Sequence, residues 1–141
     1  NLLIIGGSQG AKIFDDLVKK TIIKLSKKYK LKIYQQTSSI NFESFKKTYE
    51  NNNINCELFN FNDDVVNFMR KTDLCITRAG ASTLAELNFT EIPYLAIPLP
   101  TAKDNHQFEN AYFYNKLGFN WLLNQKEIDE RSFYYTSEFI Q

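Results

Sequence analysis

Short apolar runs alternate along this chain with longer segments in which apolar residues recur at helical spacing. The short runs predict strands at Leu2–Ile5, Leu31–Gln35, Ile54–Phe59, Leu74–Thr77, Tyr94–Ile97 and Phe119–Leu123. The longer segments predict helices at Ala11–Lys28, Phe42–Glu50, Asp63–Arg70, Ser82–Phe89 and Asp104–Leu117. This alternation predicts an α/β fold of the Rossmann type, with a parallel sheet of about six strands covered by helices on both faces.

The predicted sheet also indicates where a ligand would bind. Parallel sheets bind ligands in the crevice beyond the carboxyl ends of their strands, so the turns that follow the strands are the places to search. The length of 141 residues fits one domain, residues 1–141, and a hydrophobic content of 43% suffices for its core.

A glycine-rich turn, Gly6–Ala11, joins the first predicted strand to the first predicted helix. Glycines let a ligand approach the backbone, and the free amides of a helix start favour an anion. The turn does not match the Walker pattern, because Lys12 follows alanine rather than glycine. It also fails the dinucleotide pattern, because the first glycine would fall on Ile5 when Gly7 and Gly10 are the other two. The turn is therefore either an anion site or a plain tight turn.

A second glycine turn lies in the segment Thr77–Glu86, between the fourth predicted strand and the next helix. The amides of Ala81, Ser82 and Thr83 would be unpaired at this helix start, so a diphosphate would be held without a metal ion. Glu86 follows closely, and a carboxylate there would accept hydrogen bonds from two ribose hydroxyls. The alternative for Glu86 is a capping box with Thr83, in which the glutamate bonds back to the helix-start amide.

The loop after the fifth predicted strand ends in Asp104-Asn105-His106-Gln107. Asp104 is predicted to be the N-cap of the next helix, which would place His106 and Gln107 in its first turn, facing the crevice. The carboxamide of Gln107 both donates and accepts, which suits sugar hydroxyls. His106 is interpreted as a polar ligand contact or a surface residue rather than as a catalytic base.

Together these segments resemble the C-terminal, donor-binding domain of the MurG family of N-acetylglucosaminyltransferases. The resemblance runs from Leu2 to Ile128 and implies that Glu86 holds the ribose, the helix-start amides hold the phosphates, and Gln107 and, more weakly, His106 contact the sugar. A further similarity at Phe61–Asp64 implies that the backbone there reads the uracil edge; an ordinary N-capped helix is the alternative. The substrate-binding residues implied are Gly7, Ser8, Gln9, Gly10, Asn62, Gly80, Ala81, Ser82, Thr83, Glu86, His106 and Gln107.

The resemblance also implies a function. The chain would be one half of a GT-B glycosyltransferase, an inverting, metal-independent hexosyltransferase that moves N-acetylglucosamine from UDP-N-acetylglucosamine to lipid I in peptidoglycan synthesis. The other, N-terminal half would hold the lipid-linked acceptor, the membrane contact and the catalytic base, and the chain therefore looks cut from a longer protein. No metal or cofactor is implied, and the whole enzyme would lie in the bacterial cytoplasm, at the inner face of the plasma membrane.

Charge and cysteine content exclude several other classes. The net charge of +1 gives no overall electrostatic attraction for nucleic acid. Most of the early lysines, from Lys19 to Lys32, fit the solvent-exposed face of one helix. Cys56 and Cys75 lie in predicted strands, are expected to be free thiols, and give no zinc spacing with the single histidine. Two alternatives stay open: the donor half of another UDP-sugar transferase, and a non-catalytic nucleotide-binding module. A nicotinamide-dependent dehydrogenase is disfavoured by the failed dinucleotide pattern.

Overall fold

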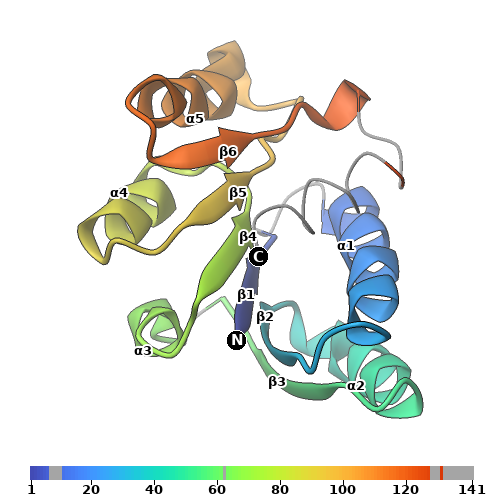
Figure 1. Ribbon diagram of the computed structural model, residues 1–141. Helices are drawn as coiled ribbons and strands as arrows, with labels where there is room; N and C mark the ends of the chain where they lie inside the picture. The colour runs from blue at the N-terminus through green and yellow to red at the C-terminus, as the bar shows by residue number, and fades with distance from the viewer. Residues whose placement is uncertain (7–10, 62, 128–130, 132–141) are drawn as a thin grey trace.

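The structure is a computed structural model, and it describes residues 1–6, 11–61, 63–127 and 131 (Figure 1). The strands are β1 (Leu2–Ile5), β2 (Lys32–Gln36), β3 (Asn55–Phe59), β4 (Leu74–Thr77), β5 (Tyr94–Ala96) and β6 (Asn120–Leu122). The helices are α1 (Ala11–Ser26), α2 (Phe42–Asn51), α3 (Val65–Met69), α4 (Ala81–Phe89) and α5 (His106–Lys116). Short 3-10 turns lie at η1 (Ser39–Asn41), η2 (Lys103–Asn105) and η3 (Gln125–Glu127).

The strands form one parallel sheet in the order β3-β2-β1-β4-β5-β6. This is the Rossmann order, and it confirms the predicted α/β fold with six strands. The chain winds outward from β1 in one direction and from β4 in the other. The carboxyl ends of β1 and β4 therefore form the switch point, where a sheet of this kind opens a crevice.

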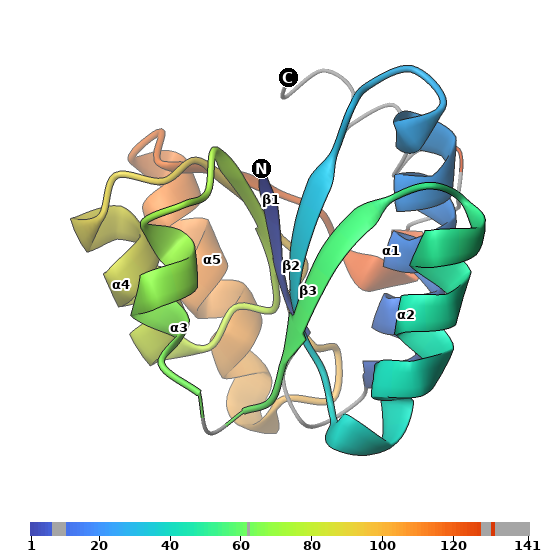
Figure 2. The same ribbon diagram turned by 90° about the horizontal axis from the view of Figure 1, so that it is seen from below.

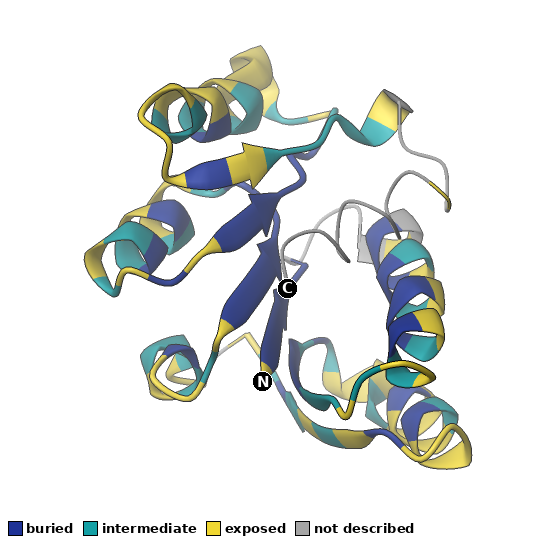
Figure 3. Cartoon of the chain, in the orientation of Figure 1, coloured by how far each residue is buried: buried dark blue, intermediate teal, exposed yellow. Residues whose placement is uncertain are grey.

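The two faces of the sheet are covered by different helices (Figure 2). Alternate side chains of β1 point to opposite faces: Leu2 and Ile4 pack with residues of α1 and α2, whereas Leu3 and Ile5 pack with residues of α3, α4 and α5. Figure 3 shows the strands β1, β4 and β5 as the buried centre of the molecule, while the outer sides of the helices are exposed. The sheet is thus a rigid support for the loops at its carboxyl edge.

Several helix ends differ from the predicted ones. The first helix ends at Ser26 rather than Lys28, because the amides of Lys27 and Lys28 bond three residues back, to Lys24 O and Leu25 O, in a tighter turn. The short helix α3 begins after Asp64, whose carboxylate accepts from Val66 N at 3.1 Å. The ordinary N-capped helix considered for this segment is therefore present.

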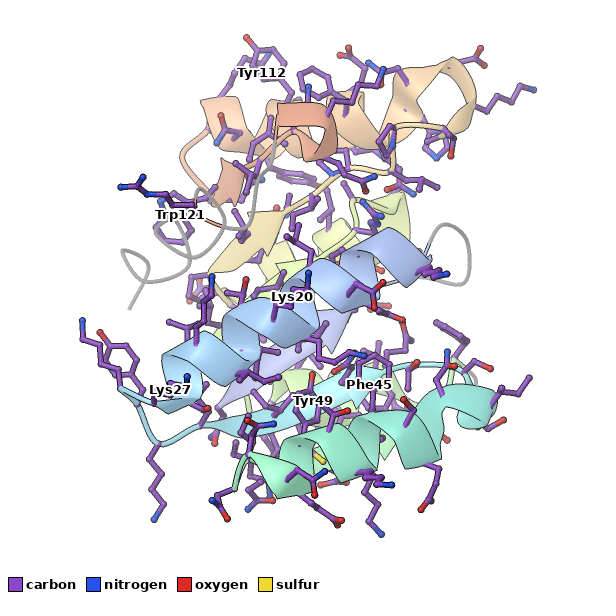
Figure 4. All side chains as sticks on the ribbon, turned by 90° about the vertical axis from the view of Figure 1, so that its right-hand side faces the viewer. Lys20, Lys27, Phe45, Tyr49, Tyr112 and Trp121 are labelled. Atoms are coloured by element: carbon purple, nitrogen blue, oxygen red, sulfur yellow. The ribbon has the colours of Figure 1, made fainter. Side chains whose placement is uncertain are left out.

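Most of the predicted lysines are exposed, whereas two aromatic residues of α2 face the core. Lys20 lies on the outward side of α1, as the sequence predicted, and Lys27 is exposed in the turn that follows this helix (Figure 4). Phe45 and Tyr49 lie on the side of α2 that faces the core, where the Tyr49 hydroxyl donates to Gln35 Oε1 at 2.6 Å. Both cysteines are free thiols, as expected, and burial raises the pKa of each.

A buried polar cluster around Tyr94 joins β5 to β6, α4 and α5. The Tyr94 hydroxyl accepts from Asn88 Nδ2 and from Asn120 Nδ2, each at 3.0 Å. Asn120 Nδ2 also donates to Ala111 O at 3.2 Å. The cluster fixes the edge strand β6 to the two helices beside it.

Tyr94→Phe should lower the free energy of unfolding by about 1–3 kcal/mol, because the side-chain amides of Asn88 and Asn120 each lose one of their acceptors in a buried cluster. Urea unfolding followed by circular dichroism measures the change. The matched control is Tyr112→Phe, which removes the same atom from a ring that is 41% exposed. The control should change stability by less than about 0.5 kcal/mol; equal effects would contradict a stabilising role for the cluster.

Candidate functional site

The switch point, where a crevice is expected, begins where β1 ends. Gly6 is buried there, and a Cβ at this position would lie only 3.0 Å from Phe14 Cδ1. Glycine therefore lets α1 pack closely against the end of β1. The predicted ligand contacts Gly7, Ser8, Gln9 and Gly10 lie outside the described residues.

Arg78 ties together the ends of three strands. Its backbone amide donates to Ile5 O at 2.9 Å, and its Nη1 donates to Ile97 O at 3.2 Å and to Pro98 O at 3.4 Å. The guanidinium lies 4.8 Å from the centre of the Phe14 ring. The role of Arg78 could not be assigned from the sequence; the structure makes it a buried support beneath the crevice. The only sequence signal was a charged residue placed directly after an apolar strand.

Two buried charges of opposite sign lie under the site. Burial raises the pKa of Asp15 to about 6, against the lowering effect of Lys19 and Arg78. Burial likewise lowers the pKa of Arg78 to about 10, although Asp15 opposes that shift. Asp15 is the residue next to Phe14 on α1, and its side chain is near Gly6.

Asp15→Asn should remove a pH dependence of stability. The folded carboxyl keeps its proton up to about pH 6 while the unfolded one loses it near 3.8, so native stability falls as pH rises through that window. The variant should therefore match the wild type near pH 4 and gain up to about 3 kcal/mol above pH 6, the equivalent of two pKa units. Urea unfolding across pH 4–8 measures the difference. Glu57→Gln, at an exposed carboxylate on β3, is the control and should leave the pH dependence of stability as in the wild type.

The start of α4 lies beside this support. Gly80 is its N-cap with φ −65° and ψ 140°, and no side chain caps the helix. Helical hydrogen bonding begins with Leu84 N to Gly80 O at 3.0 Å, so the amides of Ala81, Ser82 and Thr83 precede it. Ala81 and Ser82 are exposed. The helix start therefore presents donors at the switch point, as the sequence predicted.

The helix begins at Ala81, not at Ser82 as predicted, and this start tests one of the two interpretations of Glu86, the capping box. A capping box would need Thr83 as the N-cap, but Thr83 lies inside the helix. The capping-box alternative is therefore wrong. Glu86 is half-buried and shares a helix face with Ser82 and Thr83, four and three residues earlier.

The loop before α5 differs from its prediction in the residues that directly precede the helix. Asp104 is not the N-cap of α5: it has φ 51° and lies in η2, and Asn105, with φ 56°, precedes the helix. Two successive left-handed residues are unusual, although Asp and Asn tolerate this backbone better than most. The helix consequently begins at His106, two residues later than predicted. His106 is exposed, and its Nδ1 lies 2.7 Å from Lys103 O, so Nδ1 donates and Nε2 is left as the acceptor in the neutral ring.

The side-chain oxygen of Gln107 is already bonded to the backbone of two other loops. This oxygen, Oε1, accepts from Ala79 N at 3.1 Å and from Leu99 N at 3.0 Å. Beside it, Asn110 Nδ2 donates to Ala79 O at 3.2 Å. A hollow of about 250 Å³ opens next to this loop, between Pro98–Pro100, Phe108 and Lys126 among others. The sequence did not reveal these contacts, because they join residues far apart in the chain.

Asn62, the last of the predicted contacts, lies outside the described residues. Within the described part of the chain, no group of three or more His, Cys, Asp or Glu residues is arranged to bind a metal ion. The described helices include none with the length and apolar character needed to cross a membrane.

The strand order and the helix start at the switch point define a Rossmann-type α/β domain, the architecture of one half of a GT-B glycosyltransferase. The family model described as "Glycosyltransferase family 28 C-terminal domain" matches residues 1–134. The chain belongs to this family.

Named relatives agree with the family assignment. The chain is 89% identical over 132 residues to the UDP-N-acetylglucosamine--N-acetylmuramyl-(pentapeptide) pyrophosphoryl-undecaprenol N-acetylglucosamine transferase of Pelagibacter ubique, covering 94% of this chain and 37% of that protein. It is 43% identical over 130 residues to the enzyme of the same name from Rickettsia bellii, covering 90% and 36%. The chain thus spans somewhat more than a third of the length of these relatives.

A solved structure agrees as well. The crystal structure of Acinetobacter baumannii MurG superposes with a TM-score of 0.86 at 27% identity, covering 99% of this chain and 40% of that one. These matches confirm the resemblance to the MurG family that the glycine turns and the Asp104–Gln107 segment indicated.

Proposed function

We propose that this chain binds UDP-N-acetylglucosamine as the donor half of an enzyme that transfers N-acetylglucosamine to lipid I, making lipid II for peptidoglycan. The observation that carries the proposal is the start of α4, where uncapped amides face the switch point and Glu86 follows on the same helix face as Ser82 and Thr83. The amides would bind an anion and the carboxylate would bind a diol. A nucleoside diphosphate carries both groups, the diphosphate and the ribose, next to each other.

Each part of the donor has a proposed partner. The diphosphate binds the amides of Ala81–Thr83 and the turn Gly7–Gly10, and the ribose binds Glu86. The backbone at Phe61–Asp64 reads the uracil, with Asn62 in that turn. His106 Nε2 and the amide of Gln107 contact the sugar. These assignments follow the family resemblance residue by residue.

The chemistry asked of these residues is positioning and stabilisation of the leaving group. As the acceptor hydroxyl attacks the anomeric carbon, negative charge grows on the UDP oxygen. Backbone amides and the positive end of α4 stabilise that charge in place of a metal ion. The catalytic base, the lipid-linked acceptor site and the membrane contact belong to the other half of the protein. The whole enzyme acts in the cytoplasm, at the inner face of the plasma membrane.

Calorimetric titration of the 141-residue chain tests the proposal, with UDP, UDP-N-acetylglucosamine, UDP-glucose and NAD, first without metal and then with Mg²⁺. Binding of UDP and UDP-N-acetylglucosamine without metal supports it. Preference for UDP-glucose would assign the chain to another UDP-sugar transferase. Preference for NAD, or binding that requires Mg²⁺, would contradict the proposed site.

A further inference from the structure

One residue just before α4 is held by α5 at both its backbone N–H and its backbone C=O. Ala79 is fully buried and lies directly before Gly80, the N-cap of α4. Its N–H donates to Gln107 Oε1 at 3.1 Å, and its C=O accepts from Asn110 Nδ2 at 3.2 Å. Gln107 and Asn110 are three residues apart, so they share one face of α5.

The same carboxamide oxygen also holds a second loop. Gln107 Oε1 accepts from Leu99 N at 3.0 Å, just after β5. A carbonyl oxygen has two lone pairs, and both are used by backbone amides here. Gln107 Oε1 therefore has no lone pair for a sugar hydroxyl, and only the Nε2 amide is available to donate to a ligand.

Arg78 completes the arrangement from the opposite direction. It precedes Ala79 in the chain and donates to Ile97 O and Pro98 O, so the loops after β4 and β5 are bonded to each other as well as to α5. The backbone that leads into α4 is thus fixed on three sides. Its direction decides where the amides of Ala81–Thr83 point.

We infer that Gln107 and Asn110 are positioning residues: they clamp the backbone of Ala79 at its N–H and its C=O, and so aim the start of α4 at the diphosphate of the nucleotide. The inference deepens the proposed function and rests on it. It gives Gln107 two tasks, because the oxygen orders the diphosphate site while the Nε2 amide contacts the sugar. It also gives Asn110 a role in nucleotide binding without any ligand contact.

The first test is the affinity for UDP, which lacks the sugar. Gln107→Met and Asn110→Leu should each weaken UDP binding about tenfold, the equivalent of one lost hydrogen bond in the ordering of the site. A Gln107 that only contacted the sugar would leave UDP binding unchanged. The control is Asn115→Leu on the same helix, which also loses one bond to a backbone oxygen, Asn120 O at 2.8 Å, away from Ala79. It should bind UDP like the wild type.

The second test measures the protection of the clamped backbone amides in the absence of any ligand. Hydrogen exchange of the Ala79 and Leu99 amides, followed by NMR, should be faster in Gln107→Met than in the wild type. Gln107→Glu keeps the accepting oxygen and should restore the protection of both amides. Wild-type UDP affinity in Gln107→Met and Asn110→Leu, or unchanged exchange in Gln107→Met, would overturn the clamp. Failure of the wild type to bind UDP would instead contradict the proposed function. Hydrogen exchange of the Ala79 amide would still test whether Gln107 holds this backbone.

Discussion

Glu86→Ala is expected to weaken the binding of UDP by at least about 100-fold. Hydrogen bonds to a charged group contribute about 1.5–3 kcal/mol each, and the carboxylate would accept two from the ribose. Glu86 is half-buried on the helix face that also carries Ser82 and Thr83, so its carboxylate and the free amides would contact one ligand. Calorimetric titration of the variant with UDP measures the loss.

Two comparisons make this result specific. Glu109→Ala removes an exposed carboxylate from the first turn of α5 and should leave UDP binding unchanged. The 2′-deoxy analogue of UDP should bind the wild type more weakly, yet bind Glu86→Ala about as well as UDP does, because the lost partner is the same. A variant that binds UDP like the wild type would remove Glu86 from the site.

Gly80→Ala is expected to weaken UDP binding by about 10- to 100-fold while the domain stays folded. The backbone of Gly80 has φ −65°, which alanine adopts, and the nearest atom to an added Cβ is Thr83 Oγ1 at 3.9 Å. The fold itself therefore does not require glycine. A methyl group between the backbone and a bound phosphate costs about 1–3 kcal/mol as overpacking.

Gly118→Ala is the matched substitution. Gly118 follows α5 with φ 82°, where a side chain costs about 1–2 kcal/mol of stability, and a Cβ would touch nothing within 4 Å. This variant should lose stability and keep UDP affinity, whereas Gly80→Ala should lose affinity and lose at most about 1 kcal/mol of stability, the cost of a poorer N-cap. Titration and urea unfolding of both variants check the contrast. Equal UDP affinity in Gly80→Ala and the wild type would show that the ligand does not approach this backbone.

The sequence predicted the strands and their order of appearance well, because buried parallel strands appear as short apolar runs between helical segments. The helix predicted at Asp104–Leu117 stops directly before Gly118, whose left-handed backbone favours glycine after a helix. The predicted start of α5 was wrong, because Asp104 is a residue type that often forms an N-cap. Its left-handed backbone is set by the loop around it, which local residue preferences do not encode.

The site was predicted in part. Glycine turns at strand ends and Glu86 follow from local pattern and family resemblance. The supporting contacts could not be predicted from local pattern, because Arg78, Gln107 and Asn110 bond to backbone atoms of distant segments. Any polar side chain can make such a bond, so its partner becomes visible only when the sheet brings the loops together.

The strand order also has a consequence for how the domain folds. Leu2 pairs with Leu74, while β2 and β3, which come between them in the chain, lie on the other side of β1. The entropy lost on closing a chain segment grows with its length, and pairings this distant slow the search for the native state. The crevice is created by this pairing, so neither half of the sequence holds it alone. A nucleotide bound across the ends of β1 and β4, as proposed, would stabilise their pairing by mass action, so that the free energy of unfolding would rise with the nucleotide concentration.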